Sequence, residues 1–220
     1  MPLNLKGMIF DLDGTLAETW PICFDAFRNV FKHYTGRVYS DEEIEAMYGP
    51  DEEGIIKRLV PDLWQEGVEM YLREYELAHN LCEEPFPGIK EALELLKERG
   101  VLLAVVTGKG IGSADISLKR LGLSEYFDVV EPGHPSGGRK PDSIRKVLKK
   151  WQIAPEKTAY IGDSPSDSDG AKEVGMIALG AAWSVYADKE KIAARNPSAI
   201  FINVASFIDW IKQNVSQMTN

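Results

Sequence analysis

The chain has 220 residues, of which 44% are hydrophobic and 27% are charged, as in a soluble globular protein with one sizeable core and a smaller second unit. Its formal net charge of -9 argues against a surface for nucleic acid or anionic membranes, because such surfaces need clustered lysine and arginine. The chain has no apolar run of membrane-spanning length, no signal peptide and only two cysteines, so we expect it in the cytoplasm, without a specific protein partner.

The first predicted element is a short buried strand over residues 7–12, an apolar run that ends in aspartate. After it, apolar residues recur at helical spacing in the segments 19–34, 40–50 and 62–79. Thr19 is placed as the N-cap of the first of these helices, and Ser40 and Glu43 have the spacing of a capping box. Residues 17–85 are therefore predicted to form an all-helical insert.

Beyond a hinge rich in proline at residues 83–88, the pattern changes to helices that alternate with strands. Helices are predicted over 89–100, 113–122, 142–151, 169–175 and 207–213, and strands over 101–108, 127–130, 158–164, 176–183 and 199–205. Such alternation implies right-handed crossovers and a mostly parallel sheet. The predicted fold is an α/β core of residues 1–16 and 86–220, interrupted after its first strand by the helical insert.

Pairs of carboxylates follow two of the predicted strands. "DLDGT" places Asp11 and Asp13 after the first strand, and "IGDSPSD" places Asp163 and Asp167 after the fourth. Because ligands of open α/β sheets bind at the carboxyl ends of the strands, we expect these four acids to lie close together. Four carboxylates repel one another unless a cation lies among them, and oxygen ligands that must also admit a phosphate favour Mg²⁺ over zinc.

Two further segments carry groups suited to a phosphate. "VVTGK" offers the hydroxyl of Thr107 and the unhindered amide of Gly108 at a turn from strand to helix. "GGRKPD" offers Lys140, which could neutralise a carboxylate and a phosphoryl oxygen together. Arg139 and Lys109 are nearby cations that could take this role instead of Lys140.

The motifs "DLDGT", "VVTGK", "RKP" and "GDSPSD", in this order, resemble the four motifs of the haloacid dehalogenase (HAD) superfamily. The helical insert between the first two motifs resembles the C1-type cap domain of that family, and the resemblance extends over nearly the whole chain. It implies a Rossmann-like parallel-sheet core with an inserted cap, and an enzyme that acts on a small phosphorylated metabolite.

The resemblance also implies roles for the four acids. Asp11 would attack phosphorus and form an aspartyl-phosphate. Asp13 would protonate the leaving oxygen and then activate the hydrolytic water. Mg²⁺ would be held by the Asp11 carboxylate, the Asp13 backbone carbonyl and Asp163, with Asp167 in support through water. Asp169 is an alternative for the place of Asp167.

For the other two motifs, the resemblance implies that Thr107 and Gly108 bind the phosphoryl group and that Lys140 binds it too and orients Asp11. The acid at position 13 favours phosphate chemistry over dehalogenation, since the dehalogenases of the superfamily keep no acid there. The phosphonate-cleaving branch carries a cap lysine where residues 49–53 are acidic and contain no lysine.

The expected activity is therefore that of a Mg²⁺-dependent phosphatase similar to the phosphoglycolate phosphatases. Three alternatives stay open: a phosphomutase resembling β-phosphoglucomutase, a pyrophosphatase, and a non-catalytic binding or regulatory protein of the same fold. The mutase branch carries a histidine in the first cap helix where this chain has Cys23, which disfavours that alternative.

Residues of the insert would select the substrate. The cations that could meet a carboxylate or a second phosphate are Arg28, Lys32, Arg37, Lys57 and Arg58. Helical periodicity alone does not show which of them point inward. Without an inward cation, a neutral alcohol or sugar phosphate is favoured over phosphoglycolate. Trp20 and Pro21 are expected to pack at the start of a helix, with a place in the substrate wall as the alternative.

Overall fold

The structure, a computed structural model, describes residues 3–217 and contains a six-stranded parallel sheet in the order β3-β2-β1-β4-β5-β6. The strands are β1 (Gly7–Phe10), β2 (Leu102–Val106), β3 (Val129–Glu131), β4 (Thr158–Gly162), β5 (Ile177–Ala181) and β6 (Ala199–Phe201). Strand β1 lies between β2 and β4, so the three strands that precede the polar motifs are neighbours. The predicted parallel α/β sheet is confirmed.

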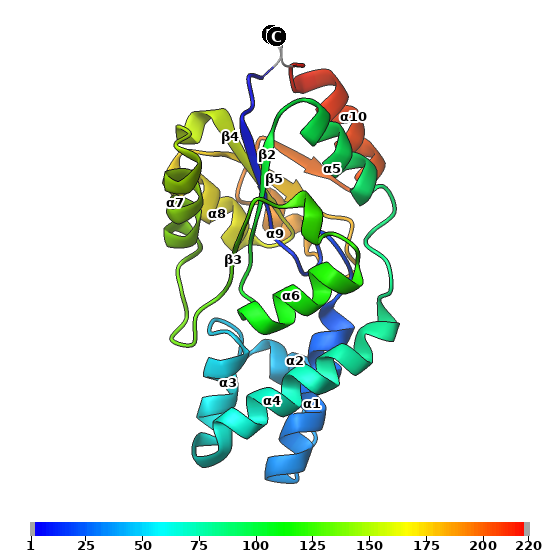
Figure 1. The fold of residues 1–220 in the computed structure, drawn as a ribbon, viewed down its shortest axis with the longest axis vertical. Helices are drawn as coiled ribbons and strands as arrows, with labels where there is room; N and C mark the ends of the chain where they lie inside the picture. The colour runs from blue at the N-terminus through cyan, green and yellow to red at the C-terminus, as the bar shows by residue number, and fades with distance from the viewer. Residues whose placement is uncertain (1–2, 218–220) are drawn as a thin grey trace.

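Helices cover both faces of this sheet: α7 and α8 lie on one face, and α5 and α10 on the other (Figure 1). The helices of this part are α5 (Ile89–Glu98), α6 (Ile111–Arg120), α7 (Lys140–Trp151), α8 (Pro165–Val174), α9 (Lys189–Ala193) and α10 (Val204–Asn214). Alternate residues of β1 point to opposite faces. Met8 and Phe10 belong to one buried cluster with Phe207, and Ile9 belongs to another with Ile144. Burial on both faces explains the continuous apolar run in this strand.

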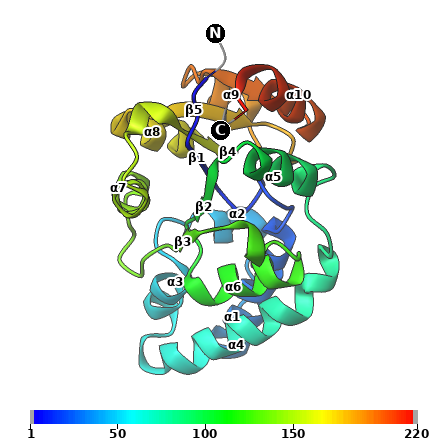
Figure 2. The ribbon, with the colours of Figure 1, turned by 45° about the horizontal axis from the view of Figure 1, so that its top comes forward.

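The segment between β1 and α5 is helical and lies beyond the carboxyl ends of the strands, at the lower end of the molecule in Figure 1. Its elements are α1 (Trp20–Thr35), α2 (Asp41–Glu45), α3 (Glu52–Leu59), α4 (Trp64–Leu77) and the 3-10 turns η1 (Pro61–Leu63) and η2 (Ala78–Leu81). Phe27 of α1 packs against Tyr71 of α4 with tilted rings whose centroids are 4.5 Å apart. Helix α4 also runs beside α6 (Figure 2), which joins the helical segment to the sheet-containing part.

The local predictions at helix starts differ in their outcome. The capping box of Ser40 and Glu43 is present at α2. Thr19 is the N-cap residue of α1, but its hydroxyl makes no capping bond and donates to Asp13 instead. Helix α8 begins at Pro165, four residues earlier than predicted, because Ser164 and Asp167 form a capping box there. No helix within residues 3–217 has the length and apolar character of a membrane span.

Candidate active site at the carboxyl ends of the strands

Asp11 directly follows β1 and lies in the interior, beside a lysine from the first turn of α7. The Lys140 Nζ atom is 2.6 Å from Asp11 Oδ2 and also contacts Asp167. Burial raises the pKa of Asp11 from 3.8 to about 7, against the opposing effect of Lys140 and with a further increase from Asp167. Lys140 is thus the cation that reaches Asp11, whereas Arg139 is exposed and pairs with Glu173.

Three buried acids form a cluster that is suited to a hard cation. Asp11, Asp163 and Asp167 each offer a carboxylate oxygen, and these oxygens lie within 4.8 Å of one another. Burial, followed by the neighbouring Asp11 and Asp167 carboxylates, raises the pKa of Asp163 well above its usual value. One lysine does not balance three carboxylates, and oxygen-only donors fit Mg²⁺. The residues present therefore fit the metal that the sequence predicts.

The turn after β1 brings Asp163 close to the chain at Gly14. Gly14 has a φ of 68°, in the left-handed region, and a Cβ there would lie 2.0 Å from Asp163 Oδ2. Glycine is required at this position for both reasons. Gly14 therefore leaves the room that the Asp163 carboxylate occupies beside the turn after β1.

Asp167 is fully buried and both of its carboxylate oxygens accept hydrogen bonds. Lys140 donates to Oδ1, and Ser164 donates to Oδ2 from its backbone amide at 2.9 Å and from its hydroxyl at 2.6 Å. Asp169 is exposed and lies 3.1 Å from Arg195. The structure thus brings Asp167, and not Asp169, into the acidic cluster.

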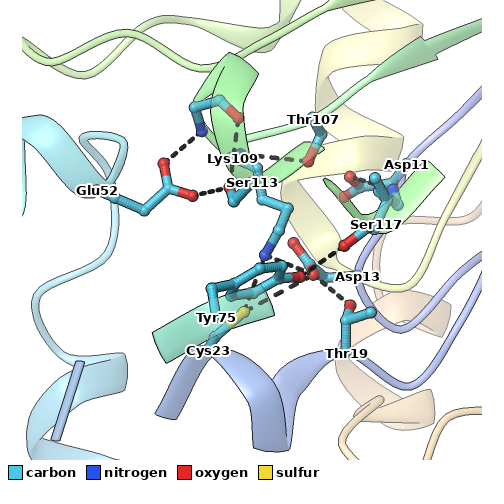
Figure 3. A network of polar contacts seen from close by, with 12 residues as sticks. Asp11, Asp13, Thr19, Cys23, Glu52, Tyr75, Thr107, Lys109, Ser113 and Ser117 are labelled. Atoms are coloured by element: carbon cyan, nitrogen blue, oxygen red, sulfur yellow. Dashed lines mark hydrogen bonds and ion pairs between the residues drawn. The ribbon is translucent and has the colours of Figure 1, made fainter. Parts of the chain in front are cut away.

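Asp13 has different partners, which come from the start of α1 and from the loop after β2 (Figure 3). Its Oδ1 accepts a hydrogen bond from Thr19 Oγ1 and lies 3.1 Å from Lys109 Nζ. The Lys109 Nζ atom is also 3.0 Å from Cys23 Sγ and 4.4 Å from the centre of the Tyr75 ring. No residue in the described range 3–217 hydrogen-bonds to Asp13 Oδ2, whereas Oδ1 has several partners.

Sequence reasoning named Lys109 only as an alternative to Lys140 and Thr19 only as an N-cap, and it missed the contacts of both residues with Asp13. Burial lowers the pKa of Lys109, but the combined effect of Asp13, Cys23 and the neighbouring tyrosines outweighs it, so the pKa is raised well above its usual value. Burial likewise raises the pKa of the Cys23 thiol, to about 12. A charged lysine and a neutral thiol therefore flank Asp13. The signal available in the sequence was the position of Lys109 within "VVTGK", two residues after Thr107.

The loop after β2 exposes a backbone amide beside the acidic cluster. Thr107 is buried and its Oγ1 accepts a hydrogen bond from the Lys109 amide at 3.2 Å. Gly108 is exposed and lines the cavity beside these residues, and a Cβ at this position would meet no atom within 4 Å. Gly133 packs closely against this loop, because a Cβ at position 133 would lie 2.1 Å from the Gly108 carbonyl oxygen. The arrangement suits the binding of an anion.

Comparison with known proteins decides the family. The chain matches the family model of the haloacid dehalogenase-like hydrolases over residues 8–181. This chain belongs to that family. The pyrophosphatase PpaX of Anoxybacillus flavithermus is 28% identical over 89% of this chain and 91% of its own length. A phosphorylated carbohydrates phosphatase of Thermotoga maritima is 32% identical over 79% of this chain and 82% of its own length.

A solved structure shows the same fold. The haloacid dehalogenase-like family hydrolase SP0104 from Streptococcus pneumoniae matches with a TM-score of 0.76 and 27% identity, over 94% of this chain and 99% of that chain. The predicted family, its Rossmann-like core and the predicted enzyme class, a HAD-like phosphatase, are confirmed.

In this HAD-like hydrolase a cavity of about 1,010 Å³ lies between the helical insert and the strand ends. The motif residues Asp11, Asp13, Thr107, Lys140 and Asp163 line it from the sheet side. From the insert it is lined by Trp20, Cys23, Phe27, Tyr48, Gly49, Pro50, Asp51, Glu52, Ile55 and Tyr71. None of the five candidate cap cations lines this cavity. For example, Arg28 and Lys57 form ion pairs within the insert.

Glu52 fastens the insert of this HAD-like hydrolase to the sheet-containing part (Figure 3). Its carboxylate accepts hydrogen bonds from the Gly110 amide and the Ser113 hydroxyl, both at the N-terminus of α6. Next to it, the Asp51 amide donates to the carbonyl of His134 at 3.1 Å. The positive end of the α6 dipole favours a carboxylate in this place.

Proposed function

We propose that this chain is a Mg²⁺-dependent phosphatase that hydrolyses a small phosphorylated metabolite through an aspartyl-phosphate on Asp11. The observation that carries the proposal is the contrast between two carboxylates one residue apart. Asp11 lies against Lys140 and the acidic cluster, whereas Asp13 is bonded to Thr19 and Lys109. Different surroundings allow one carboxylate to be the nucleophile and the other to be the general acid and base.

The metal would be held by the Asp11 carboxylate, the Asp13 backbone carbonyl and Asp163, with Asp167 in support. When bound, Mg²⁺ supplies positive charge that offsets the carboxylates and the phosphate oxygens. The buried acidic cluster, with Lys140 as its one contacting cation among residues 3–217, supports this assignment.

In the first step, an Asp11 oxygen attacks phosphorus, the bond from phosphorus to the leaving oxygen breaks, and Asp13 donates its proton to that oxygen. Oδ2 of Asp13 is suited to carry this proton, because Oδ1 already accepts from Thr19. Thr107 and the Gly108 amide bind the phosphoryl oxygens, and Lys140 orients Asp11 and binds phosphoryl charge. Fixed donors of this kind stabilise the charge that develops during phosphoryl transfer.

In the second step, Asp13 takes a proton from water as the water oxygen attacks phosphorus. The bond between phosphorus and Asp11 then breaks, which releases phosphate and restores both carboxyl groups to their starting states. Lys109 and Thr19 keep the Asp13 carboxylate in one place through both steps, so the same group serves first as acid and then as base.

We assign residues 17–85 to a cap domain and residues 1–16 and 86–220 to the core domain. The cap would open to admit substrate and close to exclude water before attack. Hinges are predicted near residues 15–20 and 82–88. Glu52 supports this division, because it joins α3 of the cap to α6 of the core without a covalent link.

We also propose that the enzyme works in the cytoplasm on a small molecule. Cys23 and Cys82 are both buried and free, which suits a reducing compartment. Nucleic acid, membrane and protein partners form no part of the proposed activity.

The phosphomutase alternative is less well supported. A mutase needs a group in the cap that can exchange a proton near Asp13, and the group in that place is the Cys23 thiol. Burial raises the pKa of this thiol to about 12, so it is a poor proton donor. The intact set of motif residues argues against a non-catalytic protein.

The test is phosphate release from a panel of phosphorylated metabolites, p-nitrophenyl phosphate and pyrophosphate. The assay is run with Mg²⁺, with EDTA, and with an Asp11→Asn variant. We expect release that needs both Mg²⁺ and Asp11, with a loss of about 10³-fold or more in the variant. Folded, Mg²⁺-loaded protein that releases no phosphate from any compound would contradict the proposal.

A further inference from the structure

We propose that Trp20 and Tyr48 form a subsite for the leaving group, and that this leaving group is an uncharged alcohol bearing hydroxyls. The preferred substrate is then a phosphate monoester of a polyol or sugar, rather than a compound with a second anion near the phosphate. This inference rests on the proposed phosphatase activity and specifies what the cap selects.

The first observation is a pair of polar atoms without partners. Trp20 Nε1 and Tyr48 Oη are buried, and neither has a hydrogen-bond partner within the described part of the chain. Both residues line the cavity, and their ring centroids are 5.4 Å apart. A buried polar group without a hydrogen-bond partner destabilises a protein. Two such groups in one wall of a cavity indicate a ligand that supplies their partners.

The second observation places one of these atoms near the reacting groups. Trp20 Nε1 lies 2.9 Å from the position that a Cβ on Gly14 would take, and Asp163 Oδ2 lies 2.0 Å from the same point. The indole therefore reaches the edge of the acidic cluster. Its N–H can only donate, so it requires an oxygen acceptor on the ligand. Burial raises the pKa of Tyr48 well above its usual value, so its hydroxyl stays protonated and can donate or accept.

The third observation is the charge on the two sides of the cavity. We call the side formed by the helical insert the cap wall, and the side formed by the sheet-containing part the core wall. The cap wall contributes the acids Asp51 and Glu52 and, among its described residues, no lysine or arginine. The lysines and arginine of the core wall are each paired with an acid: Lys109 with Asp13, Lys140 with Asp11 and Asp167, Arg139 with Glu173, and Lys146 with Glu131. A second phosphate or a carboxylate would therefore lose water without gaining a free counterion.

The shape and apolar character of the wall agree with a ring or a carbon chain. Trp20, Tyr48 and Phe27 present aromatic rings to the cavity, with Phe27 and Tyr48 centroids 6.3 Å apart. Aromatic rings pack against the C–H faces of an alcohol, while Trp20 and Tyr48 keep a polar atom available for its hydroxyls. The wall thus combines apolar surface with two polar atoms that have no partner in the chain.

The experiment compares kcat/KM for a hexose monophosphate with kcat/KM for phosphoglycolate and pyrophosphate, at one Mg²⁺ concentration. p-Nitrophenyl phosphate, which has no hydroxyls, reports the phosphatase activity itself. We expect the hexose monophosphate to exceed both anionic compounds by about tenfold or more. Equal or better turnover of phosphoglycolate or pyrophosphate would overturn the inference while leaving the phosphatase in place. Failure to hydrolyse even p-nitrophenyl phosphate would overturn both.

Variants separate recognition from folding. Tyr48→Phe and Trp20→Phe should each lower kcat/KM for the hexose monophosphate by about 3- to 10-fold, the effect of one lost hydrogen bond. Both variants should lower kcat/KM for p-nitrophenyl phosphate less than they lower it for the hexose monophosphate, because the nitrophenyl leaving group carries no hydroxyl to bind the lost polar atom. Tyr34→Phe, a cap tyrosine outside the cavity lining, is the matched control and should change neither value. An equal loss on both substrates would contradict the subsite.

Discussion

The core wall and the cap wall of the cavity differ in how completely their polar groups are paired. On the core side, Asp11, Asp13 and Lys140 each bond to another residue of the chain. On the cap side, Trp20 Nε1 and Tyr48 Oη have no partner within residues 3–217. The groups to which we assign the chemistry are thus held by the protein, whereas the groups that we propose select the substrate have no partner within the chain. The following predictions test this contrast.

The largest effect is expected from the core wall. Lys140→Met removes the charge that contacts both Asp11 and Asp167, so kcat should fall by about 10²–10³-fold. The matched control is Arg139→Met, the neighbouring cation, which is exposed and pairs with Glu173. Steady-state kinetics on p-nitrophenyl phosphate measure both variants. Equal losses of kcat in the two variants would show that the contacts of Lys140 with Asp11 and Asp167 make no specific contribution to catalysis.

A second variant tests the environment of Asp13. Lys109→Met removes the ammonium group that lies 3.1 Å from Asp13 Oδ1. General acid catalysis matters most for a poor leaving group, so kcat should fall by about 10-fold on p-nitrophenyl phosphate and about 100-fold on a sugar phosphate. The exposed Lys119→Met is the control on α6. A uniform loss on both substrates would contradict the assignment of Lys109 to Asp13.

The third prediction concerns pH and metal removal. The pKa of Asp11 is raised from 3.8 to about 7, so between these pH values the native state holds a proton that the unfolded chain has lost. In EDTA, this group should therefore make the free energy of unfolding decrease as pH rises from about 4 to about 7. Mg²⁺ binds the carboxylate form, so it should raise Tm more at pH 8 than at pH 5.

Thermal unfolding of wild-type and Asp11→Asn protein, with Mg²⁺ and with EDTA, measures this linkage. The variant should show a weaker pH dependence in EDTA and a smaller gain from Mg²⁺. Stability in EDTA that depends on pH to the same extent in both proteins would exclude Asp11 as the group responsible.

The smallest effect is expected where the two walls meet. Glu52→Gln keeps the shape of a side chain that accepts from the Gly110 amide and the Ser113 hydroxyl, but removes its charge and one acceptor. The closed cap should be weakened, and KM should rise by about 3- to 10-fold with a smaller change in kcat. Glu53→Gln, whose partner is Lys57 within the cap, is the matched control. The same KM in both variants would contradict a role for Glu52 in closure.

The core wall was largely predictable from the sequence, and the cap wall was not. Asp11, Asp163 and Thr107 follow strands, and a parallel sheet necessarily brings the ends of neighbouring strands together. The contact of Thr19 with Asp13 depends on how α1 approaches the core, and that of Lys109 depends on the path of the loop after β2. No local pattern specifies either. Likewise, helical spacing in the cap did not reveal that Arg28 pairs with Asp41 or that Glu52 reaches α6.

The most direct test of the account is to identify the residue that carries the phosphoryl group. Substrate is mixed with Mg²⁺-loaded enzyme, the reaction is stopped within one turnover, and borohydride reduces any acyl phosphate to an alcohol. Mass spectrometry of the peptides then locates the reduced residue. We predict homoserine at position 11 and an unmodified Asp13. Reduction at Asp13, or phosphate release with no reduced aspartate, would contradict Asp11 as the nucleophile.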